Sequence, residues 1–280
     1  MKGLTRNTLR RATLALSLGA ASLIAHAHEQ QFPIDGHKLD TYTAGTGAAT
    51  VIFESGFGTG WDTWNKVLTP IESHAKVFAY SRAGIGHSDA LSKPRDLTQH
   101  VDALEKLLAA SGQKPPYILV GHSYGSLLMR AFAARHPADV QGLVLVDPTP
   151  EGYARRMREL DPKRAAKDEA TLLGYIPPKF QAEYHLIADG ILKTGHLPFN
   201  AQLPQVPTVI LTSTVAEIPD FLDYTPEGRR IWREEHARMF ASVGQGSHVV
   251  TAASGHNIQN EEPALVISAI EQVLDASEKH

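Results

Sequence analysis

Six short apolar runs, separated by longer segments of mixed polarity, constrain the fold of this chain more than any other feature. The runs are rich in Val, Ile and Leu and lie at residues 49–56, 76–84, 116–123, 142–148, 207–214 and 248–254. Nearly continuous apolar runs of this length are typical of strands covered on both faces, as in a parallel sheet. Three further segments, 97–112, 126–137 and 261–277, have apolar residues at helical spacing. The alternation predicts an α/β fold with a doubly wound, mostly parallel sheet.

One stretch, residues 148–204, has no convincing strand pattern and is too long for a plain connection. We expect a small helical insertion that forms a lid over the carboxyl ends of the strands; a solvated helical excursion is the alternative. An apolar pocket is expected at this edge of the sheet. Its candidate lining residues are Trp61, Trp64, Tyr175, Ile176, Phe180, Tyr184, Leu186 and Ile187.

The first 27 residues have the pattern of a signal peptide. Basic residues at positions 2, 6, 10 and 11 precede an apolar stretch at 12–25, and Ala25-His26-Ala27 forms an A-x-A site. The apolar stretch is shorter than the roughly 20 residues of a spanning helix, which disfavours a membrane anchor. We therefore expect cleavage after Ala27, a mature domain at 28–280, and export to the periplasm or the medium, with no stable membrane span after cleavage.

Composition excludes several classes of function. The 280 residues are 42% hydrophobic and 20% charged, with a formal net charge of -3 and no cysteine. The balance is that of a globular protein without a basic patch, so nucleic acid is not an expected partner. The lack of cysteine rules out disulfides and thiolate chemistry. The 14 histidines include no H-E-x-x-H motif and no close His/Asp triplet, so we expect no metal.

Gly121-His122-Ser123-Tyr124-Gly125 stands where the third apolar run meets the segment 126–137. In a G-x-S-x-G turn between strand and helix, the serine is strained and its hydroxyl is lifted clear of the sheet. The flanking glycines let strand and helix approach, and the first helix amides face any oxygen bound nearby. This context favours a nucleophilic serine over a structural turn.

A serine hydroxyl needs a base, and histidine is the usual one. His256 follows the last apolar run and precedes a Pro-started helix, which places it at the carboxyl edge of the sheet, where catalytic groups gather. His248 lies at the start of that run, at the opposite edge, and is the weaker candidate. We interpret His122 and His87 as pocket or structural histidines.

Four motifs together resemble the α/β-hydrolase family, in its esterase-like serine hydrolase branch. They are ESGFGTGWDTW at 54–64, YSRAGIGHSD at 80–89, GHSYGS at 121–126 and SGHNIQNEEP at 254–263. The resemblance implies Ser123 as nucleophile, His256 as general base and then acid, and no organic cofactor. It also implies an oxyanion hole formed by the backbone amides of Phe57 and Tyr124. Many members have His-Gly where this chain has Ser55-Gly56, preceded by Glu54, which we interpret as a polar brace for the loop. Arg82, in the second motif, is interpreted as structural.

Two places in the sequence offer the acidic partner of the histidine. Family members most often carry it after the strand that follows the lid, where this chain has Glu217 and Asp220 but no Gly-x-x-Asp turn. Asp147 instead directly follows the apolar run before the lid. A carboxylate there needs a partner, and an imidazolium is a suitable one. We favour Asp147, with Glu217 as the alternative; capping the start of the lid is another possible role for Asp147.

The sequence therefore predicts an exported serine hydrolase that cleaves an ester-type bond of a small molecule through an acyl-enzyme. The elbow serine disfavours the epoxide hydrolase and haloalkane dehalogenase branches, which need a carboxylate there. A cofactor-free haloperoxidase, a C–C hydrolase, an acyltransferase and a ligand receptor without activity are the alternatives on the same fold.

Overall fold

A computed structural model describes residues 27–200, 203–218 and 220–278. The predicted signal peptide thus lies, apart from Ala27, outside the described residues. None of the helices in these ranges is long and apolar enough to cross a membrane.

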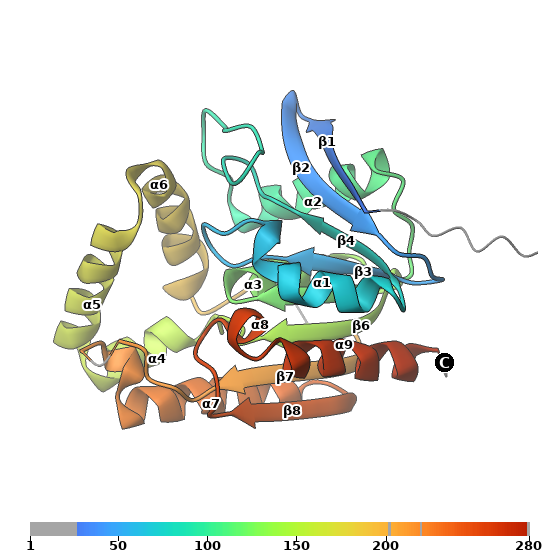
Figure 1. The fold of residues 1–280 in the computed structure, drawn as a ribbon. Helices are drawn as coiled ribbons and strands as arrows, with labels where there is room; N and C mark the ends of the chain where they lie inside the picture. The colour runs from blue at the N-terminus through green and yellow to red at the C-terminus, as the bar shows by residue number, and fades with distance from the viewer. Residues whose placement is uncertain (1–26, 201–202, 219, 279–280) are drawn as a thin grey trace, which may run out of the picture.

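Eight strands form one sheet in the order β1-β2-β4-β3-β5-β6-β7-β8 (Figure 1). Strands β3 to β8 run parallel, whereas β2 pairs antiparallel with both β1 and β4. The strands are β1 (His28–Ile34), β2 (His37–Ala44), β3 (Thr50–Glu54), β4 (Lys76–Tyr80), β5 (Tyr117–His122), β6 (Val140–Val146), β7 (Pro207–Ser213) and β8 (Gln245–Thr251). The predicted α/β fold with a mostly parallel sheet is confirmed.

The six predicted strands correspond to β3–β8, and the hairpin β1–β2 was not predicted. Strand β1, HEQQFPI, is mostly polar and exposed, so it lacks the apolar run by which buried strands are recognised. Strand β8 begins at Gln245, three residues before the predicted start at 248. Its first residues, Gln-Gly-Ser, are polar and do not extend the apolar run, but they pair with β7 through the backbone. His248 consequently lies in the middle of β8 rather than at its start.

Helices cover both faces of the sheet and bury two cores. In Figure 1, α1 and α9 lie in front of the sheet and α2 and α3 behind it. Side chains of β5 alternate between the cores: Ile118 and Val120 join α1 and α9, and Leu119 joins α2 and α3. The helices are α1 (Asn65–Glu72), α2 (Leu97–Ala110), α3 (Tyr124–Arg135), α7 (Pro226–Ala241), α8 (Ile258–Glu261) and α9 (Pro263–Ser277).

Between β6 and β7 the chain forms a group of helices outside the sheet. They are α4 (Tyr153–Leu160), α5 (Pro162–Tyr175) and α6 (Pro178–Ile187), followed by the π-helix η2 (Ala188–Leu192) and the short 3-10 helix η3 (Pro198–Asn200). Figure 1 shows α5 and α6 projecting beyond the carboxyl ends of the strands. Helix α5 buries none of its residues, and the buried Tyr153 and Met157 of α4 pack with Leu222 and with Ile231 and Trp232 of α7. Helix α4 thus packs on α7 rather than in a core formed by these helices alone. Two further 3-10 helices, η1 (Trp61–Trp64) and η4 (Leu222–Tyr224), lie in other connections.

Candidate active site

The turn between β5 and α3 holds Ser123 in a strained backbone conformation, with φ 52° and ψ -122°. The two flanking glycines are required by close backbone contacts. A Cβ on Gly121 would lie 2.8 Å from Ser126 Cα, and one on Gly125 would lie 2.5 Å from the carbonyl oxygen of Glu54. The sequence therefore forms the tight strand-to-helix turn that the G-x-S-x-G spacing predicts.

Ser123, His256 and Asp147 form one line of hydrogen bonds. Ser123 Oγ lies 2.9 Å from His256 Nε2, and His256 Nδ1 lies 2.7 Å from Asp147 Oδ2. The three residues follow β5, β8 and β6, whose carboxyl ends meet at the same edge of the sheet. His248 takes no part in this line, because its Nε2 instead contacts Thr212 Oγ1 at 2.8 Å.

Asp147 is fully buried and its carboxylate is fully engaged. Its Oδ1 accepts the backbone N–H of Ser213 and the indole N–H of Trp232, both at 2.9 Å, and Oδ2 faces His256. Burial alone would raise the pKa of this carboxyl, but the hydrogen bond and charge of His256, with smaller contributions that include Trp232, hold the pKa below its usual value. Asp147 is therefore an ionised acceptor that keeps the Nδ1 proton of His256 in place.

The His256 ring is more basic than an ordinary histidine. Burial lowers its pKa, but the hydrogen bond to Asp147 and the negative charge of that residue raise it above 6.5. The peptide groups of His256 are also held from both sides: its N–H donates to Glu217 Oε1 and its carbonyl accepts from His122 Nε2, each at 2.9 Å. Burial lowers the pKa of His122 to about 3, so this ring is neutral and donates through Nε2–H.

Of the two acidic candidates, Asp147 contacts the histidine ring and Glu217 contacts only its backbone. Asp220 is exposed, and its carbonyl accepts from Arg164. His87 is exposed as well, and it does not line the pocket that contains Ser123.

The loop after β3 lies against the serine turn. A Cβ on Gly56 would lie 3.5 Å from Ser123 Cβ, and the rings of Phe57 and Tyr124 meet edge to face with centroids 6.0 Å apart. Tyr124 is the first residue of α3, whose first amides have no acceptor within the helix. Among the described residues, neither the Phe57 N–H nor the Tyr124 N–H donates to a backbone carbonyl in a turn, loop or helix cap.

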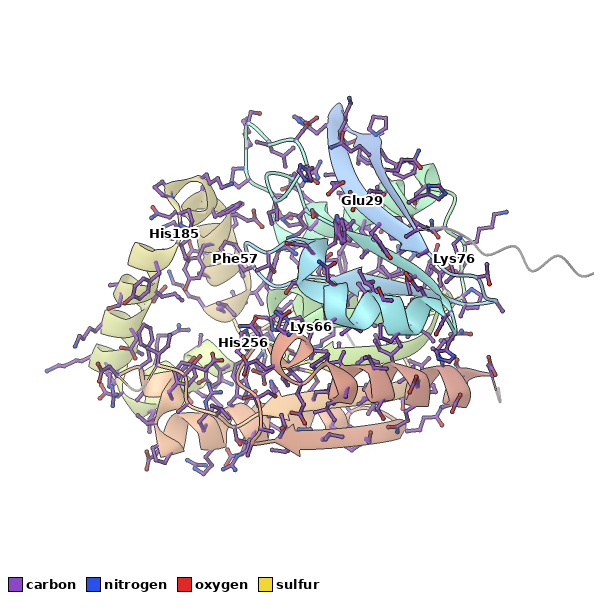
Figure 2. All side chains as sticks on the ribbon, in the orientation of Figure 1. Glu29, Phe57, Lys66, Lys76, His185 and His256 are labelled. Atoms are coloured by element: carbon purple, nitrogen blue, oxygen red, sulfur yellow. The ribbon has the colours of Figure 1, made fainter. Side chains whose placement is uncertain are left out.

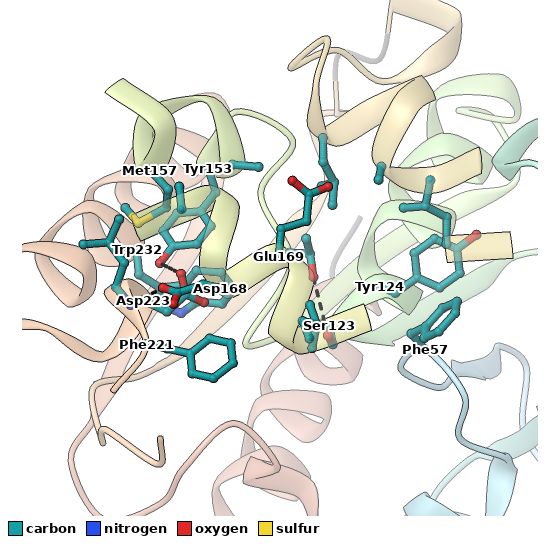
Figure 3. Close-up of a pocket in the computed structure, with 18 of the residues that line it drawn as sticks. Phe57, Ser123, Tyr124, Tyr153, Met157, Asp168, Glu169, Phe221, Asp223 and Trp232 are labelled. Atoms are coloured by element: carbon teal, nitrogen blue, oxygen red, sulfur yellow. Dashed lines mark hydrogen bonds between the residues drawn. The ribbon is translucent and has the colours of Figure 1, made fainter. Parts of the chain in front are cut away.

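A pocket of about 410 Å³ opens between Ser123 and the helices that follow β6. Figure 2 shows Phe57 and His256 on the side of the sheet that faces α5 and α6. In the close-up of Figure 3, Phe57 and Tyr124 lie on one side of Ser123, and Tyr153, Asp223 and Trp232 lie on the other. The apolar lining includes Leu127, Met157, Leu172, Ile176, Ile187 and Leu192, and Tyr184 and Phe221 add aromatic rings.

The predicted pocket lining is only partly correct. Ile176, Tyr184 and Ile187 line the pocket. Trp61 and Trp64 do not, because Trp64 is fully buried against Phe53 and Trp61 donates its indole N–H to Asp40. The other three also lie outside the lining: Tyr175 and Leu186 are exposed, and Phe180 instead packs on Phe57.

Helix α7 contributes two residues that the sequence analysis did not identify. Trp232 binds Asp147 and also lines the pocket. One turn later, His236 Nε2 donates to the carbonyl of Pro148 at 2.6 Å, next to Asp147. Burial lowers the pKa of His236 to about 4, so the ring is neutral. The only sequence pattern that relates the two residues is their i, i+4 spacing, which puts them on one face of a helix. That pattern indicates a role at the site only once α7 is known to lie beside the end of β6.

Polar and charged residues also lie in the wall of the pocket, among them Tyr153, Asp223 and Arg229. Tyr153 Oη donates to Asp223 Oδ1 at 2.5 Å, and Arg229 Nε donates to the Asp223 carbonyl at 2.8 Å.

Across residues 27–200, 203–218 and 220–278, no three His, Asp or Glu side chains are grouped so that they could hold a metal ion.

Comparison with known proteins identifies the family. The sequence model of the alpha/beta hydrolase fold matches residues 49–214, and the uncharacterized protein YqjL of Bacillus subtilis is 28% identical over 260 residues, which cover 89% of this chain and 93% of YqjL. A solved structure of a serine hydrolase involved in carbazole degradation has a TM-score of 0.65 at 18% identity and covers 89% of this chain and 99% of its own. A thermophilic esterase from Thermogutta terrifontis has a TM-score of 0.60 at 18% identity, with 90% and 99% covered. The structural likenesses show the same fold, and the family match spans more than half of the sequence and includes Ser123 and Asp147. The chain belongs to the alpha/beta hydrolase fold family, as its four motifs indicated.

Proposed function

We propose that this protein is a serine hydrolase that cleaves a carboxylic ester-type bond of a small molecule through an acyl-enzyme intermediate. The observation that carries the proposal is the line of hydrogen bonds from Ser123 through His256 to Asp147, which ends at a strained serine in the wall of a pocket. Nucleophile, base and orienting carboxylate in this order are the arrangement that activates a serine hydroxyl.

In the proposed reaction, His256 Nε2 takes the proton of Ser123 as Oγ attacks the ester carbonyl carbon. The carbonyl oxygen becomes an oxyanion that the amides of Phe57 and Tyr124 stabilise. The intermediate collapses, His256 gives the proton to the leaving alcohol, and the acyl group stays on Oγ. Water then loses a proton to His256 and attacks the acyl carbon, which releases the carboxylic acid and restores Ser123. Asp147 stays ionised and stabilises the imidazolium in both steps.

The pocket supports an ester with an apolar acyl or alcohol group. Its lining is mostly aliphatic and aromatic, and a volume of about 410 Å³ admits a chain of several carbons beside Ser123. The polar Tyr153–Asp223 pair lies away from the serine and offers hydrogen-bonding groups to the far end of a substrate.

The test is hydrolysis of p-nitrophenyl esters from acetate to palmitate by the protein and by Ser123→Ala. We expect turnover that disappears in the variant, and the preferred chain length measures the pocket. A fluorophosphonate should add one mass increment to the protein and none to the variant. A variant as active as the parent would refute the proposal. Labelling of Ser123 without ester turnover would redirect it to an acyltransferase, a C–C hydrolase or a haloperoxidase.

We also propose that the protein is exported, on the basis of the basic and apolar segments and the A-x-A site within residues 1–27. Intact mass of protein recovered from the periplasm or medium should match a chain that starts at His28. A mass that retains residues 1–27 would contradict cleavage.

A further inference from the structure

A buried ion pair lies directly beneath the loop that carries the Phe57 amide. Glu54 is fully buried at the end of β3, and Arg82, just after β4, is 3% exposed. Arg82 Nη1 donates to Glu54 Oε1, and Tyr80 Oη donates to Glu54 Oε2. Burying two charges is costly, and such a pair is weak evidence of a stabilising role. Its position therefore calls for another explanation.

Arg82 also holds the loop backbone. Its Nη1 donates to the carbonyl of Ser55 at 2.7 Å, and its Nη2 donates to the carbonyl of Gly56 at 2.5 Å. The Gly56 carbonyl and the Phe57 N–H belong to one peptide group, and this peptide is not among the cis bonds of the described chain. In a trans peptide the C=O and N–H point in opposite directions. An arginine that binds the carbonyl thus turns the N–H away from itself.

We infer that Arg82, held by Glu54, is a positioning residue that orients and polarises the Gly56–Phe57 peptide so that its N–H stabilises the oxyanion. The inference rests on the proposed serine hydrolase function and assigns a role to a residue that touches neither the substrate nor the hydrogen-bonded line of Ser123, His256 and Asp147. The Arg82 guanidinium also lies over the ring of Tyr124, 5.1 Å from its centroid, so it contacts the peptide group of one candidate amide and the side chain of the residue that supplies the other.

Two physical effects act in the same direction. A charged donor makes a stronger hydrogen bond than a neutral one, and in a buried site it draws electron density from the carbonyl and leaves the N–H of the same peptide more positive. The planar guanidinium reaches two carbonyls and a carboxylate at once, which a lysine ammonium on a flexible stem cannot do in the same geometry. Glu54 supplies the opposite charge that keeps the buried guanidinium in place.

The test compares an oxygen ester with the matching thiono ester, in which the carbonyl oxygen is replaced by sulfur, a weaker hydrogen-bond acceptor. The measured quantity is the single-turnover release of p-nitrophenol from each ester, and their rate ratio reports how much the reaction depends on the oxyanion hole. The variant is Arg82→Met/Glu54→Gln, which removes both charges and leaves neither buried alone. We expect the oxygen ester to slow by about 100-fold, since loss of one oxyanion donor typically costs this much. The ratio of the oxygen-ester rate to the thiono-ester rate should fall, because the thiono ester depends less on that donor.

A matched control is Arg130→Met/Glu151→Gln. This pair is also largely buried, with two hydrogen bonds of 2.6 and 2.9 Å, and it does not contact the loop 55–57. The rate ratio should stay at the parent value in the control, even where both rates fall. Arg82→Lys keeps the charge opposite Glu54, so it remains informative if the double variant is unfolded by circular dichroism; its ratio should fall between those of the parent and the double variant.

A folded Arg82 variant with the parent rate ratio would overturn the inference while Ser123-dependent ester hydrolysis stands. A parent protein that shows no Ser123-dependent release from the oxygen ester would refute the proposed function and the inference together.

Discussion

Replacing Asp147 with asparagine tests the acid of the proposed triad, and the structure fixes the outcome in atomic detail. Asp147 Oδ1 accepts two N–H donors, from Ser213 and Trp232. In Asp147→Asn the amide oxygen must take this place, which points the NH₂ group at His256 Nδ1. That nitrogen then becomes an acceptor and its proton moves to Nε2, the atom that faces Ser123 Oγ. His256 can no longer receive the serine proton.

The expected loss follows from the cost of the opposite amide orientation. That orientation restores the productive histidine but places an NH₂ group against two buried N–H donors. Each unsatisfied buried group costs about 1–3 kcal/mol, so the productive orientation lies about 2–6 kcal/mol higher. At about 1.4 kcal/mol per tenfold, kcat should fall by about 30-fold to about 10⁴-fold. The upper value matches the loss typical of this substitution in serine triads.

The assay is kcat for the preferred p-nitrophenyl ester, with circular dichroism to show that the variant folds. Glu217→Gln is the control, because a glutamine oxygen can still accept the His256 N–H that Glu217 binds at 2.9 Å, and we expect it to lose less than about tenfold. An Asp147→Asn variant that keeps most of its turnover, together with a Glu217→Gln variant that loses it, would refute this assignment and make Glu217 the acid.

Three further predictions concern the same site. Because pairing with Asp147 raises the pKa of His256, kcat/KM should fall with decreasing pH as His256 becomes protonated, with a midpoint above 6.5; a midpoint below 6.5 in the parent protein would contradict the pairing. Trp232→Phe removes one N–H donor from Asp147 while keeping an aromatic ring in the pocket, so kcat should fall by about tenfold with KM changed less; an unchanged kcat would show that Ser213 alone holds Oδ1. Gly125→Ala places a Cβ 2.5 and 2.6 Å from the carbonyl oxygens of Glu54 and Ser55, so the free energy of unfolding should fall by about 1–3 kcal/mol, and an unchanged Tm would show that the loop shifts freely.

The sheet and the serine turn were predictable because local sequence determines them. The apolar runs of β3 to β7 are buried on both faces, and Gly121 is required by its contact with Ser126, five residues later. Gly125 is required by the carbonyl oxygens of Glu54 and Ser55, but the G-x-S-x-G spacing already marks its position. The hairpin β1–β2 was missed because its outer strand is polar and exposed. Trp232 was missed because its role depends on a contact with Asp147, 85 residues earlier in the chain.

The choice of acid stayed open in the sequence because β6 and β7 are neighbours. Val146 and Leu211 pair at their carboxyl ends, so an acidic side chain after either strand can reach the region of His256. What separates the candidates is the position of the side chain. Asp147 directly follows its strand and meets the imidazole, whereas Glu217 lies four residues past Ser213 and meets the backbone. No sequence pattern indicates which of the two carboxylates contacts the imidazole and which contacts the backbone.

The position of Asp147 directly after β6 also explains why β7 and α7 contribute hydrogen-bond donors to the site. The carboxylate of Asp147 is wholly removed from water, so every charge-stabilising contact must come from the protein. The end of β7 supplies the Ser213 N–H, α7 supplies the Trp232 N–H, and His256 supplies the third donor. In the proposed reaction His256 exchanges protons at Nε2 and keeps its Nδ1 proton, while the N–H groups of Ser213 and Trp232 share Oδ1. Because they bind the same oxygen, they leave Oδ2 for the histidine alone, so the orientation of the carboxylate is set before substrate binds.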